Sequence, residues 1–348
     1  MKQLGQFTFG FLAFLTIVGL SSQAAEPTAL EKLDVKKILP ALRPKGIEKE
    51  VLAVLGEREG RFDTIAVRSD GGQICIGGMD GQVRLWDLTS LKLTGATPHK
   101  DVVCQSYFPS GKTLVAGDSA GNLRFWSIAN GRFTPISTVT AHKNEPIWAL
   151  QFSPDGKWLA TAGADKLIKL WDASKLPLQL KSTLSGHEDR VRALVFTPDG
   201  KSLVSCSDRD KTIRIWDVTG KPMEKQKLTA QAASACVAVS PDGASLVAGG
   251  VDGVLRTWKL GEKAEREDDL YGGKGYIYSV AFAPDGNSIL GLVKLNLTED
   301  RAFLWDRKGE VRFESKYKRH IEAVAFDPGG KHIAVVHEAS IYVIRIPD

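Results

Sequence analysis

The alternation of apolar runs and turn residues is clearest over residues 186–218, GHEDRVRALVFTPDGKSLVSCSDRDKTIRIWDV. Three short runs rich in Val, Ile and Phe are separated there by Thr-Pro-Asp-Gly and Ser-Asp-Arg-Asp. Such runs between turn residues are typical of successive antiparallel strands. Pro198 and Gly200 suit a tight reversal, because proline fixes φ and glycine accepts a positive φ. With the preceding run LQLKSTLS, the pattern predicts a small four-stranded sheet that needs neighbours to bury its faces.

The same pattern recurs along the chain. Seven turns of the Pro-Asp-Gly kind occur, and a Trp follows each of the first six. The position of this Trp, or of Ile344 in the seventh copy, recurs every 39 to 47 residues. Helical repeats of this period would not place such turns between β-branched runs. The turns are SDGG at 69, PSGK at 109, PDGK at 154 and 198, PDGA at 241, PDGN at 284 and PGGK at 328, and the following positions are Trp86, Trp126, Trp171, Trp216, Trp258, Trp305 and, in the seventh copy, Ile344.

These copies resemble the WD-repeat β-propeller family, whose units of ~40–45 residues begin with Gly-His and end with Trp-Asp. The resemblance covers residues ~50–348. It implies an all-β fold, a seven-bladed β-propeller with four antiparallel strands in each blade. The residues that carry it are Trp86-Asp87, Trp171-Asp172, Trp216-Asp217, Trp305-Asp306 and Gly186-His187.

The two ends of the repeat array predict how the ring closes. The last copy ends with a third strand, IYVIRIPD, and an extra apolar run, VLAVL at 51–55, precedes the first copy. We expect this run to be the outer strand of the last blade, because an unpaired sheet edge invites aggregation. One sheet would then contain both ends of the repeat array.

In two copies the resemblance also implies a buried polar network. A Ser-His-Asp set invites comparison with a catalytic triad, but the same residues repeat in sister blades, which favours a scaffold role. In other copies the pattern is broken: Ala120 and Glu338 replace the Asp, and the fifth and sixth copies lack the His. The two implied networks are His142, Thr161, Asp165 and Trp171 in the third copy and His187, Ser205, Asp210 and Trp216 in the fourth.

The N-terminus has the layout of a secretory signal peptide. Lys2 precedes an apolar run from Phe7 to Leu20, and Ser22-Gln23-Ala24 fits the small-x-small cleavage rule. The run is shorter than the ~20 residues of a spanning helix, so an uncleaved anchor is the alternative. We expect residues 1–24 to be removed, residues 25–49 to form a leader with a short helix, and a mature, monomeric chain without a membrane span in the periplasm or outside the cell.

Composition and cysteine usage narrow the function classes. The net charge of +5 is too small and too scattered to indicate nucleic-acid binding. Four cysteines in an exported protein allow disulfides, yet they occupy positions where sister copies have small apolar residues. We therefore expect core thiols at Cys75, Cys104, Cys206 and Cys236.

Catalytic and ligand-binding motifs are missing from the sequence. No Cys-x-x-Cys, Gly-x-Ser-x-Gly or Gly-x-Gly-x-x-Gly occurs, Val195 replaces the first Gly of a phosphate loop, and His337-Glu338 is not followed by a second His. The sequence assigns no catalytic, cofactor or metal site. Asn296-Leu297-Thr298 matches a glycosylation sequon in the longest copy.

In the resembled family, partners dock on the face formed by the loops before the first strand and between the second and third. Arg binds carboxylates and stacks on aromatic rings, so an acidic peptide or an anionic glycan is the expected ligand of an Arg and Trp cluster there. The alternative is a solvated rim without a partner. The candidate partner-binding residues are Trp148, Arg190, Arg192, Arg209, Tyr276, Tyr278 and His320.

These observations predict a non-catalytic protein-interaction scaffold that binds a protein or peptide partner, with an acidic one as the first candidate. The alternative is a propeller enzyme, a hydrolase or a quinoprotein-like dehydrogenase, with its site at the mouth of the central channel. Such enzymes gather carboxylates and His at the channel mouth, and the residues at these positions are mixed with Arg and aromatics.

Overall fold

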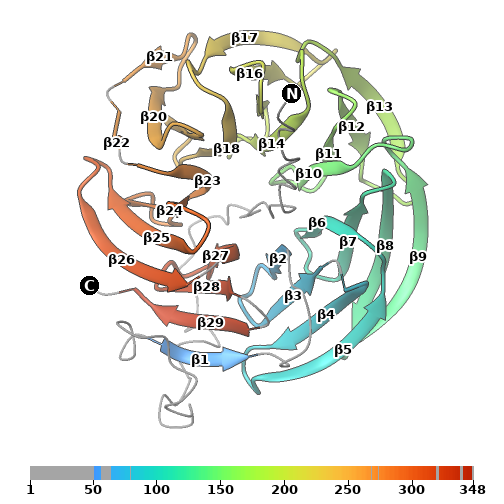
Figure 1. Ribbon diagram of the computed structural model, residues 1–348. Coiled ribbons are helices and arrows are strands. Elements are labelled where there is room, and N and C mark those ends of the chain that lie inside the picture. Colours follow the sequence, from blue (N-terminus) through green and yellow to red (C-terminus); the bar gives the residue numbers. More distant parts are fainter. Residues whose placement is uncertain are drawn as a thin grey trace, which may run out of the picture.

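The computed structural model describes residues 51–55, 64–78, 80–267, 269–272, 274–318, 321–337 and 340–346, with the backbone alone for 51–55, 271, 272 and 318. The predicted signal peptide, the leader and His320 lie outside these ranges. Within them the chain is all-β, as the repeat pattern predicted, and its strands form seven sheets arranged in a ring (Figure 1).

Each sheet is one blade, and blades 1 to 6 take their strands in chain order from the centre outward. Blade 1 contains β2 (Thr64–Val67), β3 (Gln73–Gly77), β4 (Gln82–Asp87) and β5 (Lys92–Pro98); blade 2 contains β6 (Val102–Tyr107), β7 (Thr113–Asp118), β8 (Asn122–Ala129) and β9 (Arg132–Thr140); blade 3 contains β10 (Ile147–Phe152), β11 (Trp158–Gly163), β12 (Ile168–Asp172) and β13 (Gln179–Leu184).

The remaining blades follow the same plan, except that the outer strand of blade 5 is split in two and blade 7 borrows its outer strand. Blade 4 contains β14 (Val191–Phe196), β15 (Ser202–Ser207), β16 (Thr212–Asp217) and β17 (Met223–Thr229); blade 5 contains β18 (Ser234–Val239), β19 (Ser245–Gly250), β20 (Val254–Lys259), β21 (Glu265–Arg266) and β22 (Tyr271–Gly272); blade 6 contains β23 (Tyr276–Phe282), β24 (Ser288–Lys294), β25 (Glu299–Asp306) and β26 (Val311–Lys318); blade 7 contains β27 (Ile321–Phe326), β28 (His332–His337), β29 (Ser340–Arg345) and β1 (Val51–Leu55).

The ring closes through β1. This strand pairs antiparallel with β29, with Val51 opposite Ile344 and Leu55 opposite Ile341. Blade 7 therefore contains the first and the last described strands of the chain, as the extra N-terminal apolar run predicted.

The apolar core lies between the blades. The buried apolar side chains of the described residues form seven clusters, and each cluster joins two neighbouring blades. The repeated Trp packs each blade against the one before it: Trp216 of blade 4, for example, lies among side chains of blade 3. The 40-to-47-residue spacing of these Trp residues in the sequence thus marks one blade interface after another.

Six of the innermost strands contain a β-bulge near their first residue. The pairing register shifts between Ile147 and Ala149 in β10 and between Val191 and Ala193 in β14. A bulge sets two residues of one strand against one of its partner and redirects a side chain. The residues at the bulges of blades 3, 4 and 6 are Trp148, Arg192 and Tyr278.

Candidate functional site

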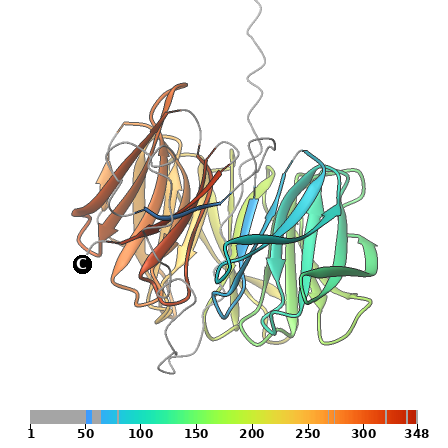
Figure 2. The same cartoon turned by 90° about the horizontal axis from the view of Figure 1, so that it is seen from below.

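The propeller has two faces with different loops (Figure 2). One, which we call the loop face, carries the connections that enter each innermost strand and those between the second and third strands. The other, which we call the turn face, carries the Pro-Asp-Gly turns between the first and second strands. The predicted partner-binding residues within the described ranges belong to loop-face segments.

Beneath the loop face, blade 4 contains the polar network that the family resemblance implied. His187 Nδ1 lies 2.7 Å from Asp210 Oδ2, and His187 Nε2 lies 2.8 Å from Ser205 Oγ. Trp216 Nε1 donates to the same Ser205 Oγ at 2.9 Å. Because the Asp210 carboxylate only accepts, the imidazole proton lies on Nδ1, toward the carboxylate, and Nε2 of the neutral ring then accepts a hydrogen bond from Ser205. Every polar group of the set is thereby satisfied.

Blade 3 repeats this network. His142 Nδ1 lies 2.8 Å from Asp165 Oδ2, His142 Nε2 lies 2.9 Å from Thr161 Oγ1, and Trp171 Nε1 donates to that hydroxyl at 3.0 Å. Burial raises the pKa of Asp165, but the hydrogen bond and charge of His142 outweigh it, so the pKa is lowered on balance. Because two blades contain the same hydrogen-bonded set, we interpret it as a stabilising element of the fold rather than as a catalytic one.

Blade 2 has the His of this set without its partners. His99 is 1% exposed and packs edge-on against Trp126, with 5.4 Å between the ring centroids. Ala116 and Ala120 occupy the positions of the hydroxyl and the carboxylate. Neither ring nitrogen of His99 has a hydrogen-bond partner in the described part of the chain. Burial, followed by the charge of Arg124, lowers the pKa of His99 to about 4.

Four loop-face side chains from blades 3 and 4 form what we call the Arg–Trp cluster: Trp148, Arg190, Arg192 and Asp208. The Arg192 guanidinium lies 4.5 Å from the Trp148 ring centroid, and that of Arg190 lies 5.9 Å from it. Arg190 also forms an ion pair with Asp208, with Nε and Nη2 each 3.0 Å from Oδ2. Because guanidinium groups stack on aromatic faces, this arrangement holds blades 3 and 4 together.

The cluster is less accessible than the sequence led us to expect. Trp148 is 9% exposed and Arg192 is 4% exposed, so the expectation that both present themselves to a partner was wrong. The reason is the β-bulge, which places these side chains in contact with each other. Arg190 stays partly exposed beside Asp208. The sequence argument placed Arg and Trp side chains next to each other on this face, but it did not foresee that Arg192 and Trp148 bury each other.

Tyr278 also belongs to the interior. It is fully buried, and its hydroxyl lies 2.9 Å from both Asp300 Oδ2 and the carbonyl oxygen of Ile321. Ile321 N donates to the same carboxylate at 3.0 Å. Tyr278 therefore joins blade 6 to blade 7 and cannot contact a partner, which corrects its assignment to the binding surface.

Tyr276 lies at the start of the same strand and remains partly exposed. Burial raises its pKa, and the charge of Arg192 opposes this effect. Since Arg192 is on blade 4 and Tyr276 on blade 6, this interaction reaches past blade 5.

The exposed anchors of the loop face lie in the loops between the second and third strands of blades 4, 5 and 6. Arg209 is exposed in the β15–β16 loop, as predicted from the sequence. Val251 in the β19–β20 loop is 48% exposed, and Leu297 in the β24–β25 loop is 82% exposed. The Asn296 side chain accepts hydrogen bonds from Thr298 N and Oγ1, which fixes the turn that presents Leu297.

Sequence reasoning missed Val251 and Leu297 as surface anchors. A signal was available, because the sixth copy carries four extra residues between turn and Trp and Leu297 lies within that insertion. For Val251 the loop sequence Gly-Gly-Val-Asp-Gly offers one apolar residue in a polar turn. We name the set of Arg209, Val251 and Leu297 the anchor triplet.

The four cysteines are free and buried. Their side chains face neighbouring strands: Cys104 Sγ lies 3.2 Å from the carbonyl oxygen of Ile147, and Cys75 Sγ lies 3.3 Å from Gln105 Oε1. Burial raises the pKa of each thiol, that of Cys236 to about 12. They are therefore poor nucleophiles in the folded chain.

The described residues hold no group of three or more His, Cys, Asp or Glu side chains arranged to hold a metal ion. In the same ranges there is no helix with the length and hydropathy to cross a membrane.

Comparison with known proteins agrees with the fold. Residues 101–335 match the family described as "IFT122 first beta-propeller", and residues 52–87 match "WD domain, G-beta repeat". The first of these matches covers more than half of the chain. Similar curated proteins include WD repeat-containing protein 3 of Mus musculus, 25% identical over 126 residues, or 36% of this chain and 13% of that protein.

Two further relatives are similar over comparable lengths. SEC12-like protein 1 of Arabidopsis thaliana is 33% identical over 112 residues, which is 32% of this chain and 27% of that protein. Protein HIR1 of Candida albicans is 29% identical over 97 residues, which is 27% of this chain and 9% of that protein. The matched segments thus span about a quarter or less of these relatives. With the seven blades and their repeated Trp, the family match shows that the chain belongs to the WD-repeat β-propeller family.

Proposed function

We propose that this chain is a non-catalytic protein-interaction scaffold, exported to the periplasm or the extracellular space, that binds its partner on the loop face over blades 4 to 6. WD-repeat propellers in general act as scaffolds for protein interactions, so the class of function follows from the family. The place of binding and the chemistry of the partner are our proposal, and they rest on the anchor triplet.

The observation that carries the proposal is the exposure of apolar side chains in neighbouring loops. Val251 and Leu297 come from adjacent blades and are 48% and 82% exposed. Exposed apolar side chains grouped on one face, beside an Arg, are typical of protein-binding surfaces. Arg209 adds a cation on the next blade. The fitting partner is a protein segment that offers apolar side chains to Val251 and Leu297 and a carboxylate to Arg209.

The Arg–Trp cluster supports this surface from below. Arg190 and Asp208 neutralise each other, and Arg192 is stacked on Trp148, so these charges are largely satisfied without a partner. They hold the β15–β16 loop that carries Arg209, because Asp208 is its neighbour in sequence. We infer that the cluster acts as a rigid base, and that the anchor triplet makes the direct contacts.

The experiment is site-specific cross-linking in the native host. A photoreactive amino acid replaces Leu297 in one variant and Lys201, on the turn face, in a matched control. We expect the partner to be cross-linked at position 297 and not at 201. N-terminal sequencing of the exported protein, expected to begin near Ala25, tests the location in the same sample.

Affinity for the captured partner then tests the triplet directly. The double variant Arg209→Ala, Leu297→Ser should lose about 2 kcal/mol of binding free energy, or ~30-fold in affinity. Lys201→Ala serves as the control. Equal affinity of the double variant and the wild type would place the binding surface elsewhere.

A further inference from the structure

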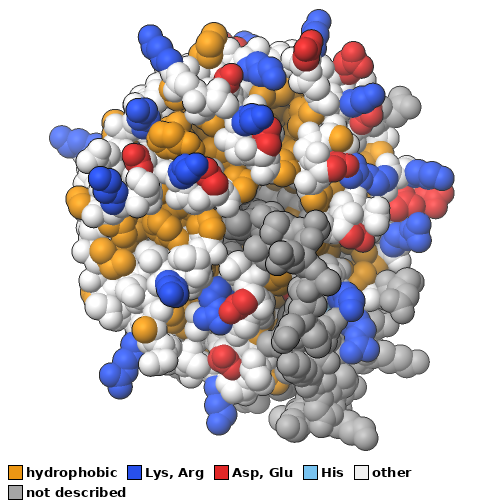
Figure 3. Space-filling model, turned by 180° about the vertical axis from the view of Figure 1, so that it is seen from behind, with side chains coloured by type: hydrophobic (Ala, Val, Ile, Leu, Met, Phe, Trp, Pro, Cys, Tyr) orange, Lys and Arg blue, Asp and Glu red, His pale blue; other side chains and the backbone are white. Residues whose placement is uncertain are grey.

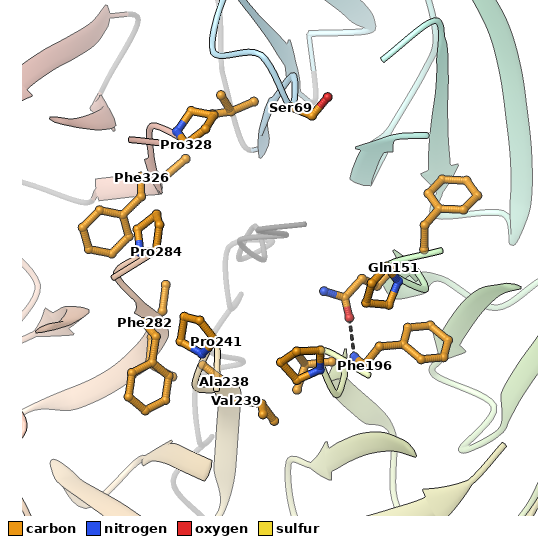
Figure 4. A pocket seen from close by; sticks show the side chains of 18 of the residues that line it. Ser69, Gln151, Phe196, Ala238, Val239, Pro241, Phe282, Pro284, Phe326 and Pro328 are labelled. Atoms are coloured by element: carbon orange, nitrogen blue, oxygen red, sulfur yellow. Dashed lines mark hydrogen bonds between the residues drawn. The ribbon is translucent and has the colours of Figure 1, made fainter. Parts of the chain in front are cut away.

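The turn face carries a second candidate site, an apolar pocket of ≈ 150 Å³ at the end of the central channel. The last residues of the innermost strands of six blades line it, together with prolines of the repeated turns. Figure 4 shows Pro241, Pro284 and Pro328 around the opening, with Phe282 and Phe326 farther from its centre. Proline has no backbone N–H, so these turns offer a ligand rigid apolar surface and few donors.

The polar groups at this pocket are mostly occupied. Gln151 Oε1 accepts a hydrogen bond from Phe196 N at 2.6 Å, which ties blade 3 to blade 4. Arg68 donates to Asp70 Oδ1 at 2.8 Å. In Figure 3, hydrophobic side chains lie above and to the left of the middle of the face, and acidic and basic side chains stand between them and farther out. The chemistry of the pocket thus favours an apolar occupant.

The chain itself supplies such a segment on this face. Val51 pairs with Ile344, near the turn-face end of β29, because Arg345 lies opposite His332, the first residue of β28 after the turn at Pro328. Strand β1 therefore begins at the turn face and ends at the loop face. The leader, residues 25–49, and Glu50 precede it directly in the sequence.

The length and composition of this leader fit the pocket. Three strand spacings separate β1 from β27 at the channel, about 14 Å, whereas a dozen residues extend to about 40 Å. The leader contains Leu30, Leu33, Ile38, Leu39 and Leu42. A tether of this length also gives the segment a high effective concentration, in the millimolar range, at the pocket.

We propose that apolar residues of the leader, between Leu30 and Leu42, bind in the turn-face pocket of their own chain. In this arrangement the leader buries apolar surface of the pocket and connects blade 7 to the other blades. The proposal is independent of partner binding on the loop face.

The first test measures access to the pocket in the full mature chain. Val239→Cys places a thiol among the pocket residues, and the four native cysteines are buried, so maleimide labelling of the folded protein reports on this position. The leader variant Leu33→Asp, Ile38→Asp, Leu42→Asp should increase the labelling rate at least tenfold. Arg209→Cys on the loop face is the matched control and should label equally fast with either leader.

The second test identifies the occupant. A photoreactive amino acid at position 38 should cross-link within one chain to pocket residues, as shown by mass spectrometry of a mixture of isotopically labelled and unlabelled protein. Links between labelled and unlabelled chains would show a second copy in the pocket and overturn the proposal. Unchanged labelling at position 239, or links only to residues outside the pocket, would overturn it too.

Discussion

The guanidinium of Arg192 lies 4.5 Å from the centroid of the Trp148 ring, and each side chain is more than nine-tenths buried. Trp148 belongs to blade 3 and Arg192 to blade 4, so the contact crosses a blade interface. Desolvated cation–π contacts contribute about 2 kcal/mol. This pair therefore stabilises the ring itself, in addition to supporting the loops above it.

Truncation of this pair should destabilise the fold. We expect Arg192→Ala to lower the free energy of unfolding by about 2 kcal/mol and Trp148→Ala by about 3–5 kcal/mol, as measured by urea titration. Arg209→Ala, at an exposed position, should stay within about 0.5 kcal/mol of the wild type. An Arg192→Ala protein as stable as Arg209→Ala would contradict the structural role of the pair.

The polar network of blade 4 should also be costly to break. Ser205→Ala leaves His187 Nε2 and Trp216 Nε1 without their shared partner in a buried site. An unsatisfied buried polar group costs about 1–3 kcal/mol, so we expect a loss of about 2 kcal/mol or more in denaturant unfolding. Ser174→Ala removes an exposed hydroxyl that donates to Asp172 and should cost far less. Equal losses would show that the network adds nothing beyond a surface hydrogen bond.

His99 should make the protein sensitive to acid. Its folded-state pKa is about 4, below the ordinary 6.5, first because of burial and second because of Arg124, against the opposing charges of Asp118 and Asp101. The unfolded chain binds the proton near pH 6.5, so stability from this site is complete above that pH. It should decline by about 3 kcal/mol as the pH falls from 6.5 to 4. Denaturant unfolding across this range measures the slope.

Two variants test the cause of this acid sensitivity. His99→Leu removes the titrating group and should flatten the profile between pH 6.5 and 4. Ala116→Thr with Ala120→Asp should rebuild in blade 2 the set found in blade 3, so that His99 gains partners and the slope shrinks. A slope that persists in His99→Leu would assign the effect to other groups.

Removal of residues 50–56 should open the ring. The deletion takes away β1 and leaves β29 as an unpaired edge, which favours aggregation. We expect a large loss of thermal stability or aggregation in light scattering. A deletion of residues 25–31, upstream of β1, is the control for a shortened N-terminus. If the 50–56 deletion melts like the full chain, the closure by β1 does not hold the ring.

Much of the fold could be predicted from the sequence, because each copy of the sequence repeat corresponds to one packed blade. Each copy must bury its Trp against the blade before it, so the number of residues from Trp171 to Trp216 equals the length of chain in one blade. Counting the copies gave the number of blades, and the strand missing from the last copy identified the N-terminal apolar run as the closing strand. The split outer strand of blade 5 could not be predicted, because only two residues of β21 and two of β22 pair with β20.

The site was less predictable, because exposure depends on local backbone irregularity. The family resemblance implied that Arg192 and Tyr278 lie on the partner-binding surface, whereas both side chains stand at β-bulges and are buried. Arg209 sits in a loop, beyond the influence of a bulge, and there the prediction of an exposed side chain agrees with the structure. Leu297 shows the opposite error: an apolar residue in a loop was passed over, although it is 82% exposed.

The pairing of Val51 with Ile344 has a consequence for the time course of folding. These two residues are 293 positions apart, so the ring cannot close until all seven copies between them have been made. At synthesis rates of ~5–20 residues per second, β1 waits roughly 15–60 s for its partner. Such a long-range contact also carries a large loop-closure entropy and slows folding. Blade stacking can therefore proceed as each copy emerges, whereas the pairing of β1 with β29 has to wait for the seventh copy.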